Sequence, residues 1–435
     1  MTKILFSLLA SGLVLSVSAQ QSISLEDAVE KTRLHNLTIQ SKVAEIERSQ
    51  KQSQLANAVY MPYVNLSYSV SRTNDPLHVF GAKLKQERVT ASDFVPQTLN
   101  HPQAVTNYNA KASIVQPIIN LAYFSQRNAA KAQLEAIRHQ LTYTEHALVF
   151  ETRKSYTQLQ MLYAVRNVLA QAKETALANR QRIQNRTSQG LAKNVDVLSA
   201  EVQLTQVENK IIENENQLRH LSDYLSYMMG EDAGEIWVPE ETLPLVQPIA
   251  DDSPMNGQRS DFLAYEQQLN ATKAMVNMYR NQFFPTLNAF GSYEFNDRNF
   301  GLGTDNYMVG LQLSWDIFRG NQLRKQKEIA QITLKERELA YQQYKRQSAV
   351  EYHQALRNIT YNAKRWELAQ KAASQSQERL RIRQNRFNEG LENTTDLLAD
   401  QSQWMEKEFE RLQARLEWQI SQYYVLYINN LSISK

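Results

Sequence analysis

The chain has 435 residues, a formal net charge of +3 and no cysteine. A charge this small, without a clustered basic run, argues against nucleic acid as a partner. The lack of cysteine excludes disulfide bonds, thiol catalysis, thiolate metal sites and a lipidated N-terminal cysteine. Only 12 glycines and 10 prolines are present. Together with abundant Gln, Asn, Glu, Lys, Leu and Ala, this scarcity is typical of long helices.

Residues 1–19 predict a cleavable secretory signal peptide. Lys3 precedes an apolar run that begins at Ile4 and ends at Val17, and a small residue, Ala19, closes the segment. A membrane anchor is the competing interpretation, but the run is shorter than the roughly 20 residues that a spanning helix needs. We therefore expect an exported chain that lies in the periplasm or enters the outer membrane as strands.

An internal repeat organises the rest of the chain. The segment Gln184–Leu191 reads QNRTSQGL and Gln384–Leu391 reads QNRFNEGL, an offset of 200 residues. Upstream, Pro62 matches Pro285 at an offset of 223 residues, whereas Gln116 matches Trp315 at an offset of 199. The first copy therefore carries an insertion of about two dozen residues between Pro62 and Gln116. The proline-rich segment between the copies predicts a connector. The predicted divisions are repeat 1 at 20–229, the connector at 230–257 and repeat 2 at 258–435.

Each repeat opens with a helical pattern that ends near a proline. Neither Pro nor Gly interrupts Ser24–Tyr60 or Ser260–Phe284, and a proline stands just beyond each run. A proline disfavours helix at the residue before it, so both helices should end there. Ser24 and Asp27 together predict the N-terminal cap of the first helix.

Beyond each proline the hydrophobic pattern has a period of two, which predicts β-hairpins at 62–117 and 285–318. Phe290 is an exception, because it falls among the polar positions. Each run has about 9 or 10 residues, the length of a tilted strand that crosses a bilayer. Aromatic residues lie near the strand ends, as at a membrane interface. These are Tyr63, Tyr68, Tyr108, Tyr293, Tyr307 and Trp315.

A solvent-facing sheet on a soluble domain is the competing interpretation of these strands. The signal peptide, the strand length and the aromatic positions favour membrane strands. Four strands are too few to close, since the smallest spanning barrels need about eight and an open edge in lipid leaves backbone groups unpaired. The chain must then oligomerise. A dimer would give eight strands and a trimer twelve, and only the trimer leaves a lumen wide enough for solutes.

After each hairpin comes a long stretch without Gly or Pro, Ile118–Gln189 and Asn321–Glu389. Each is long enough for a helix of about 100 Å, which implies a coiled-coil arrangement. Beyond Gly190, apolar residues recur at heptad spacing. Gly190 and Gly390 are therefore predicted to be the tips of two antiparallel helical hairpins. The predicted fold class is mostly α, with long coiled-coil hairpins and a small β-barrel contribution.

These features together resemble the TolC-like outer membrane efflux protein family. The resemblance rests on the Leu25–Ala28 opening, on Pro62 and Pro285, on Trp315–Phe318, and on the tips Arg186/Gly190 and Arg386/Gly390. It implies a homotrimer in the outer membrane of a Gram-negative bacterium, with a 12-stranded barrel and a 12-helix periplasmic tunnel. It also implies a periplasmic adaptor and an inner-membrane pump as partners, in efflux or type I secretion. The chain departs from the family pattern at Phe318–Asn321 and in lacking a lipidation cysteine.

The resemblance also implies roles for residues around the tips. Acidic residues after the second tip ring the periplasmic aperture in the family; Asp396 matches that place, and Asp400 stands one position beyond the usual one. Helix capping is the competing role for Asp396, and for Asp196 at the first tip, because both follow a loop by a few residues. The residues expected to contact the adaptor are Arg186, Gly190, Arg386 and Gly390. The two arginines could instead be cations that stabilise a helix C-terminus.

No constellation of an enzyme, a metal site or a cofactor site stands out. The seven histidines are scattered, and the glycine pair Gly301 and Gly303 suits an external turn rather than a phosphate loop. The sequence therefore predicts a passive channel without enzymatic activity. A periplasmic coiled-coil adaptor or scaffold without a pore is the alternative.

Overall fold

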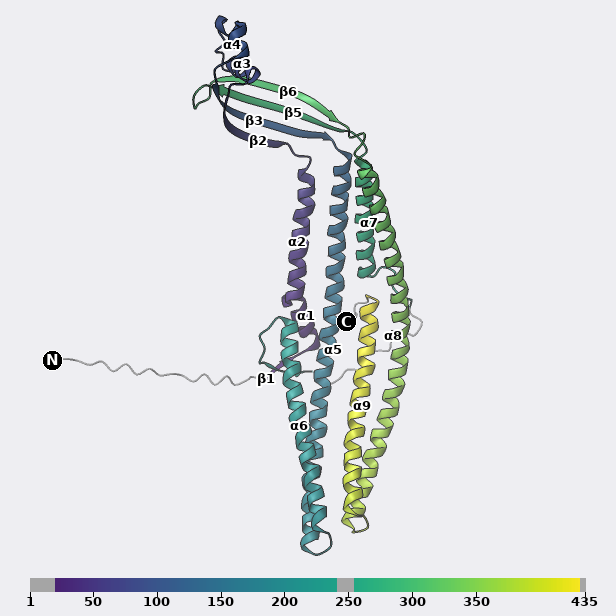
Figure 1. Ribbon diagram of the computed structural model, residues 1–435. Coiled ribbons are helices and arrows are strands. Elements are labelled where there is room, and N and C mark those ends of the chain that lie inside the picture. The colour runs from purple at the N-terminus through teal and green to yellow at the C-terminus, as the bar shows by residue number, and fades with distance from the viewer. Residues whose placement is uncertain (1–19, 241–253, 431–435) are drawn as a thin grey trace, which may run out of the picture. The chain divides into compact units, whose positions relative to one another are not determined.

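A computed structural model describes residues 20–240 and 254–430. The predicted signal peptide, most of the predicted connector after residue 240, and the last five residues lie outside the described residues. The chain is mostly helical, with one larger antiparallel sheet (Figure 1). The described helices are α1 (Leu25–His35), α2 (Leu37–Ala58), α3 (Pro76–Lys85), η1 (Ala91–Phe94), α4 (Pro96–Asn100), α5 (Leu121–Ser188), α6 (Asn194–Met229), α7 (Ser260–Asn281), α8 (Gln322–Asn388) and α9 (Thr394–Ile428). The described strands are β1 (Gln20–Ile23), β2 (Tyr63–Thr73), β3 (Val105–Ile119), β4 (Ile236–Pro239), β5 (Thr286–Asp297) and β6 (Thr304–Ser314).

The chain divides into two compact units, each built from several segments. The first comprises Met1–Val43, Gln140–Phe262 and Tyr344–Lys435. It holds α6 and α9 together with the parts of α5 and α8 that lead to them. The second comprises Ala44–His139 and Leu263–Gln343, and holds the larger sheet. None of the described helices combines the length and apolar content that crossing a membrane requires.

The first helical run is broken at one residue. The Ser24 side chain accepts the N–H of Asp27 at 3.1 Å, which confirms the predicted cap. The expectation of one uninterrupted helix up to Tyr60 is wrong, because Asn36 separates α1 from α2. Its side chain donates to the carbonyl of Met228 at 2.7 Å and accepts the N–H of Thr38 at 2.9 Å. Side-chain bonds of this kind compete with the helical backbone pattern.

A short parallel ribbon joins the start of the chain to the predicted connector. Strand β1 pairs with β4, which lies within 230–257. Trp237 of β4 is buried, and its indole N–H donates to Ser226 at 2.8 Å. The Tyr156 hydroxyl donates to the carbonyl of Ile23 at 2.9 Å. Strands of four residues carry too little periodicity to be predicted from sequence.

In the first unit, the part of α5 from Gln140 onward forms a long hairpin with α6, and the part of α8 from Tyr344 onward forms another with α9 (Figure 1). The chain turns at Gly190 and Gly390, whose φ angles are +73° and +79°. After each glycine, an N–H closes back on a helix carbonyl, from Leu191 to Arg186 at 2.8 Å and likewise after the second glycine. A glycine suits this left-handed position, since a Cβ would be strained there.

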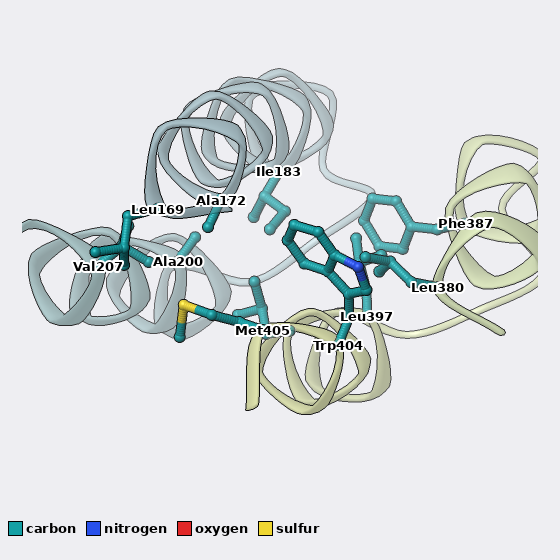
Figure 2. Close-up of a cluster of buried hydrophobic side chains, with 11 residues drawn as sticks. Leu169, Ala172, Ile183, Ala200, Val207, Leu380, Phe387, Leu397, Trp404 and Met405 are labelled. Carbon is teal, nitrogen blue, oxygen red and sulfur yellow. The ribbon is translucent and has the colours of Figure 1, made fainter. Parts of the chain in front are cut away.

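Apolar side chains from both hairpins pack together near the tips. Figure 2 shows side chains from α5, α6, α8 and α9 meeting in one cluster. Its members are Leu169, Ala172, Ile183, Ala200, Val207, Leu380, Phe387, Leu397, Leu398, Trp404 and Met405. Ala200 and Val207 belong to the heptad pattern seen in the sequence. Burial of these apolar side chains therefore fixes which faces of the helices meet.

Candidate functional site

In the second unit, a four-stranded antiparallel sheet has the order β2-β3-β5-β6. Strands β2 and β3 form one hairpin, β5 and β6 form another, and β3 pairs with β5 between them. Within the described chain, β2 and β6 are the outer strands of this sheet. Each outer strand therefore leaves backbone groups along one edge without a strand partner in the chain.

The strand register places the alternating apolar residues of all four strands on the same side of the sheet, defined here as the apolar face. In one row across the sheet, Leu66 lies opposite Ala112, Ala112 opposite Tyr293, and Tyr293 opposite Tyr307. The large apolar side chains on this face are exposed, with Leu66 at 80%, Tyr307 at 75% and Leu311 at 70%. A contiguous exposed apolar surface of this kind marks contact with lipid or another protein.

The opposite face of the sheet, the polar face, carries hydroxyl, amide and charged side chains. A row across it consists of Ser67, Lys111, Glu294 and Asn306. Phe290, the exception in the sequence pattern, also lies on this face, opposite Gly310. A Cβ on Gly310 would come within 2.8 Å of the Phe290 ring. The missing side chain of the glycine therefore makes room for the ring.

Five of the six predicted aromatic positions lie toward one end or the other of the strands. Tyr63 and Trp315 lie at the end next to the helices, and the Trp315 indole donates to the carbonyl of Phe283 at 3.0 Å. Tyr108, Tyr293 and Tyr307 lie toward the hairpin-turn end, whereas Tyr68 lies at the middle of β2. Tyr63 differs from the others, because alternation along β2 puts it on the same face as Asn65, the polar face.

In the first unit, the first tip is tied to the second hairpin by Arg186. Its guanidinium donates to the carbonyl of Phe387 at 2.8 Å and lies 4.8 Å from the centre of the Phe387 ring. Arg386 does not make the equivalent contact; it pairs with Glu392 on its own hairpin at 2.8 Å. The two predicted docking arginines are therefore not equivalent. Gly390 lies near this tie, since a Cβ on it would be 3.7 Å from Arg186.

A dense network of charged residues links α8 to α9 beside the second tip. Arg379 pairs with Asp400 at 2.7 Å, and Arg383 pairs with the other oxygen of Asp400 at 3.0 Å. Arg383 also pairs with Glu392 at 2.6 Å and lies 3.7 Å from Asp396. The Asp400 side chain is only 7% exposed. Its carboxylate is thus held by the two arginines within the hairpin.

These contacts shift two pKa values in the network. Hydrogen bonds from Arg386 and then Arg383 hold the pKa of Glu392 below its usual value. Hydrogen bonds to Asp400 and then Glu392 raise the pKa of Arg383 above its usual value. Opposite charges at hydrogen-bond distance favour the charged form of each partner. Glu392 and Arg383 are therefore both charged at neutral pH.

The other two predicted gate residues make capping contacts. Asp196 accepts the backbone N–H of Lys193 at 2.9 Å at the start of α6. Asp396 donates its own backbone N–H to the Asn393 side chain at 2.8 Å, and its carboxylate accepts from the same asparagine at 2.9 Å. Both carboxylates lie in the first turn of a helix, where negative charge is stabilised by the helix dipole. Asp396 remains 48% exposed.

Sequence reasoning missed Arg379, Arg383 and Glu392. Arg379 and Arg383 are four residues apart and so share one helix face, and Asp400 follows beyond the turn. This spacing is only a weak sequence signal for an ion-pair network. It also missed the buried amides between the hairpins. Asn179 donates to Gln401 at 2.9 Å, and both side chains are buried. Among the described residues, no cluster of His, Asp or Glu could hold a metal ion.

The sequence matches the outer membrane efflux protein family over residues 28–231 and 255–424. The match covers most of the chain. This protein belongs to the outer membrane efflux protein family. The family prediction from the sequence is confirmed. A comparison with curated protein sequences finds no match.

Solved structures show the same fold at low sequence identity. A membrane protein from Pseudomonas aeruginosa has a TM-score of 0.81 and 20% identity, covering 93% of this chain and 92% of its own. The CmeC outer membrane channel of Campylobacter jejuni has a TM-score of 0.80 and 16% identity, covering 94% and 87%. The outer membrane protein VceC of Vibrio cholerae has a TM-score of 0.78 and 15% identity, covering 94% and 97%. The chain thus has the fold of outer-membrane channels of this family.

Proposed function

We propose that the protein is a homotrimeric outer-membrane channel of a Gram-negative bacterium, in which three sheets close one 12-stranded barrel. The observation that carries the proposal is the four-stranded sheet with an exposed apolar face and two outer strands, β2 and β6. In lipid, unpaired strand edges are costly, and pairing β2 of one copy with β6 of the next removes them. The apolar face then contacts outer-membrane lipid, and the polar face lines the bore.

The channel serves as the exit duct of a tripartite efflux pump or a type I secretion system, together with a periplasmic adaptor and an inner-membrane pump. Family membership supports this assignment. The duct is a passive conduit without a catalytic step, so energy and substrate selection come from the pump. The hairpin turns at Gly190 and Gly390, with Arg186 and Arg386 beside them, dock the adaptor.

Gating takes place at the helical tips. The Arg186 contact with Phe387 ties the hairpins to one another, and the Arg383 network holds α8 against α9. Opening breaks the Arg186–Phe387 hydrogen bond as the two hairpins move apart, which is a shear of packed helices. Asp396 and Asp196 give the aperture negative charge in addition to capping their helices. Asp400, being buried, acts by positioning Arg379 and Arg383.

The proposal is tested by measuring mass and conductance on the purified full-length protein. Light scattering in detergent should give the mass of three chains, and the trimer should conduct ions in planar lipid bilayers. An Asp396→Ala variant should conduct with a weaker preference for cations, because the mouth loses negative charge. A folded monomer that stays in buffer without detergent and forms no channels would refute the proposal in favour of a pore-less periplasmic adaptor.

A further inference from the structure

The insertion of the first repeat, between β2 and β3, is a small folded body. Helix α3 starts after Asp75, whose carboxylate accepts the N–H of His78 at 2.9 Å. Asp93 in η1 pairs with Lys83 of α3 at 2.6 Å and accepts the N–H of Thr90 at 2.9 Å. The Asp93 residue is only 7% exposed. The insertion therefore has fixed internal contacts of its own.

This body is attached to the polar face of the sheet. The amide of Gln86 donates to the Asn107 side chain at 2.7 Å and to the carbonyl of Asp297 at 3.1 Å. The Lys85 ammonium pairs with Glu294 at 2.6 Å. Gln86 is buried in these contacts. The end of α3 thus reaches over the polar side of β3 and β5 rather than away from the sheet.

The contact continues across the polar face as a chain of side chains. Glu294 accepts a hydrogen bond from Asn109 at 3.3 Å, and Asn109 also donates to Asn296 at 3.1 Å. Asn107 donates to the same Asn296 oxygen at 3.0 Å. Glu294 supplies the carboxylate of this cluster, and Lys85 forms an ion pair with it. Such a cluster holds the insertion in one orientation on the strands.

We propose that this insertion, residues 76–102, is a second constriction of the channel, which limits passage at the hairpin-turn end of the sheet. The inference rests on the proposed function, since a body on the polar face obstructs passage only where that face lines a bore. Three copies bring three such bodies to one opening. The Lys85–Glu294 pair holds each of them in place, and the charges it presents act on passing solutes.

The strength of this pair suits a movable constriction. The Lys85 side chain is 50% exposed and that of Glu294 is 16% exposed, so water reaches the ammonium and screens the pair in part. The pair can therefore break and re-form as cargo passes, whereas the internal contacts of the insertion keep it folded. The constriction is separate from the gate at the helical tips, because the contacts described for it involve β3, β5 and its own helices.

A charge-swap series in single-channel recordings of the purified trimer tests whether the Lys85–Glu294 pair holds the insertion in the bore. Lys85→Glu and Glu294→Lys each place like charges together, and both should raise the conductance severalfold by releasing the insertion. The double variant restores an opposite pair and should return the conductance to the wild-type value. Glu87→Lys reverses an exposed charge two residues from Lys85 and should leave the conductance near wild type.

If the pair acted only through bore charge, the two single variants would shift cation preference in opposite directions without a shared rise in conductance. That result would overturn the constriction. Replacing 76–102 by a short Gly-Ser turn provides a second variant, which should also conduct more if it still forms trimers. Unchanged conductance in this deletion overturns the inference while the proposed function stands. A wild-type protein that forms no channel defeats the proposed function itself.

Discussion

The guanidinium of Arg186 donates a 2.8 Å hydrogen bond to the backbone carbonyl of Phe387, and so joins the tips of two hairpins that are about 200 residues apart in sequence. The same group lies over the Phe387 ring. Because the acceptor is a backbone carbonyl, the tie depends on the position of the second tip and not on the protonation of any carboxylate. Protonation of carboxylates therefore does not remove this one contact.

Arg186→Ala should shift the channel toward its open state. A hydrogen bond from a charged group contributes about 1.5 kcal/mol, and a loss of that size changes an equilibrium about tenfold. Open probability in planar bilayers is the measurement. Arg180→Ala is the matched control, because Arg180 pairs with Glu201 on its own hairpin. Equal open probabilities for the two variants would show that the tie does not gate.

Lowering the pH should open the tips through Glu392. Its pKa is held below the usual value by Arg386 and Arg383, so its contribution to closure is complete above the ordinary glutamate pKa. That contribution is lost as the pH falls below the ordinary glutamate pKa and through the lowered one. Wild-type conductance should rise in that acid range. Glu392→Gln should have higher conductance already at neutral pH and a smaller acid response.

Glu389→Gln is the control for this titration, since Glu389 is an exposed carboxylate next to the same turn. It should follow the wild-type pH profile. An acid response that survives unchanged in Glu392→Gln would assign the titration to another group.

Gly230→Ala should destabilise the protein much more than Gly190→Ala. Both glycines have a φ of +73°, so each alanine bears the same left-handed strain, about 1 kcal/mol or more. At Gly230 a Cβ would also come within 2.3 Å of the backbone oxygen of His35, whereas at Gly190 it would meet open space. The added overlap should cost about 1–3 kcal/mol. Unfolding midpoints followed by circular dichroism compare the two, and equal midpoints would contradict the contact.

Leu311→Arg should prevent insertion into the outer membrane. Leu311 is on the exposed apolar face, where an arginine near the bilayer centre costs about 2–4 kcal/mol per copy. Gln312→Arg, one residue along β6, places the same charge on the polar face and should insert normally. The fraction that stays in membranes after a carbonate wash is the measurement. Equal retention of both variants would mean that the apolar face does not contact lipid.

The tip region shows what could be foreseen from the sequence and what could not. The duplicated segments around Gly190 and Gly390 identified the turns, because glycine is required where the backbone is left-handed. They also suggested equal roles for Arg186 and Arg386. The structure gives those arginines different partners, a backbone carbonyl for one and Glu392 for the other. Similar sequences around a turn do not determine which neighbour each side chain meets.

The sequence by itself determined the features that repeat along the chain: the alternation that makes the strands, the long uninterrupted helices and the family. Periodicity is local, since it depends only on how backbone geometry orients successive side chains. Tertiary structure alone decided the attachment of the insertion through Lys85, the burial of Asp400 between two arginines and the break at Asn36. Lys85 and Glu294, and likewise Asn36 and Met228, are far apart in sequence, while Asp400 and its two arginines lie on different helices. These residues meet only when strand register and the facing of the helices are fixed.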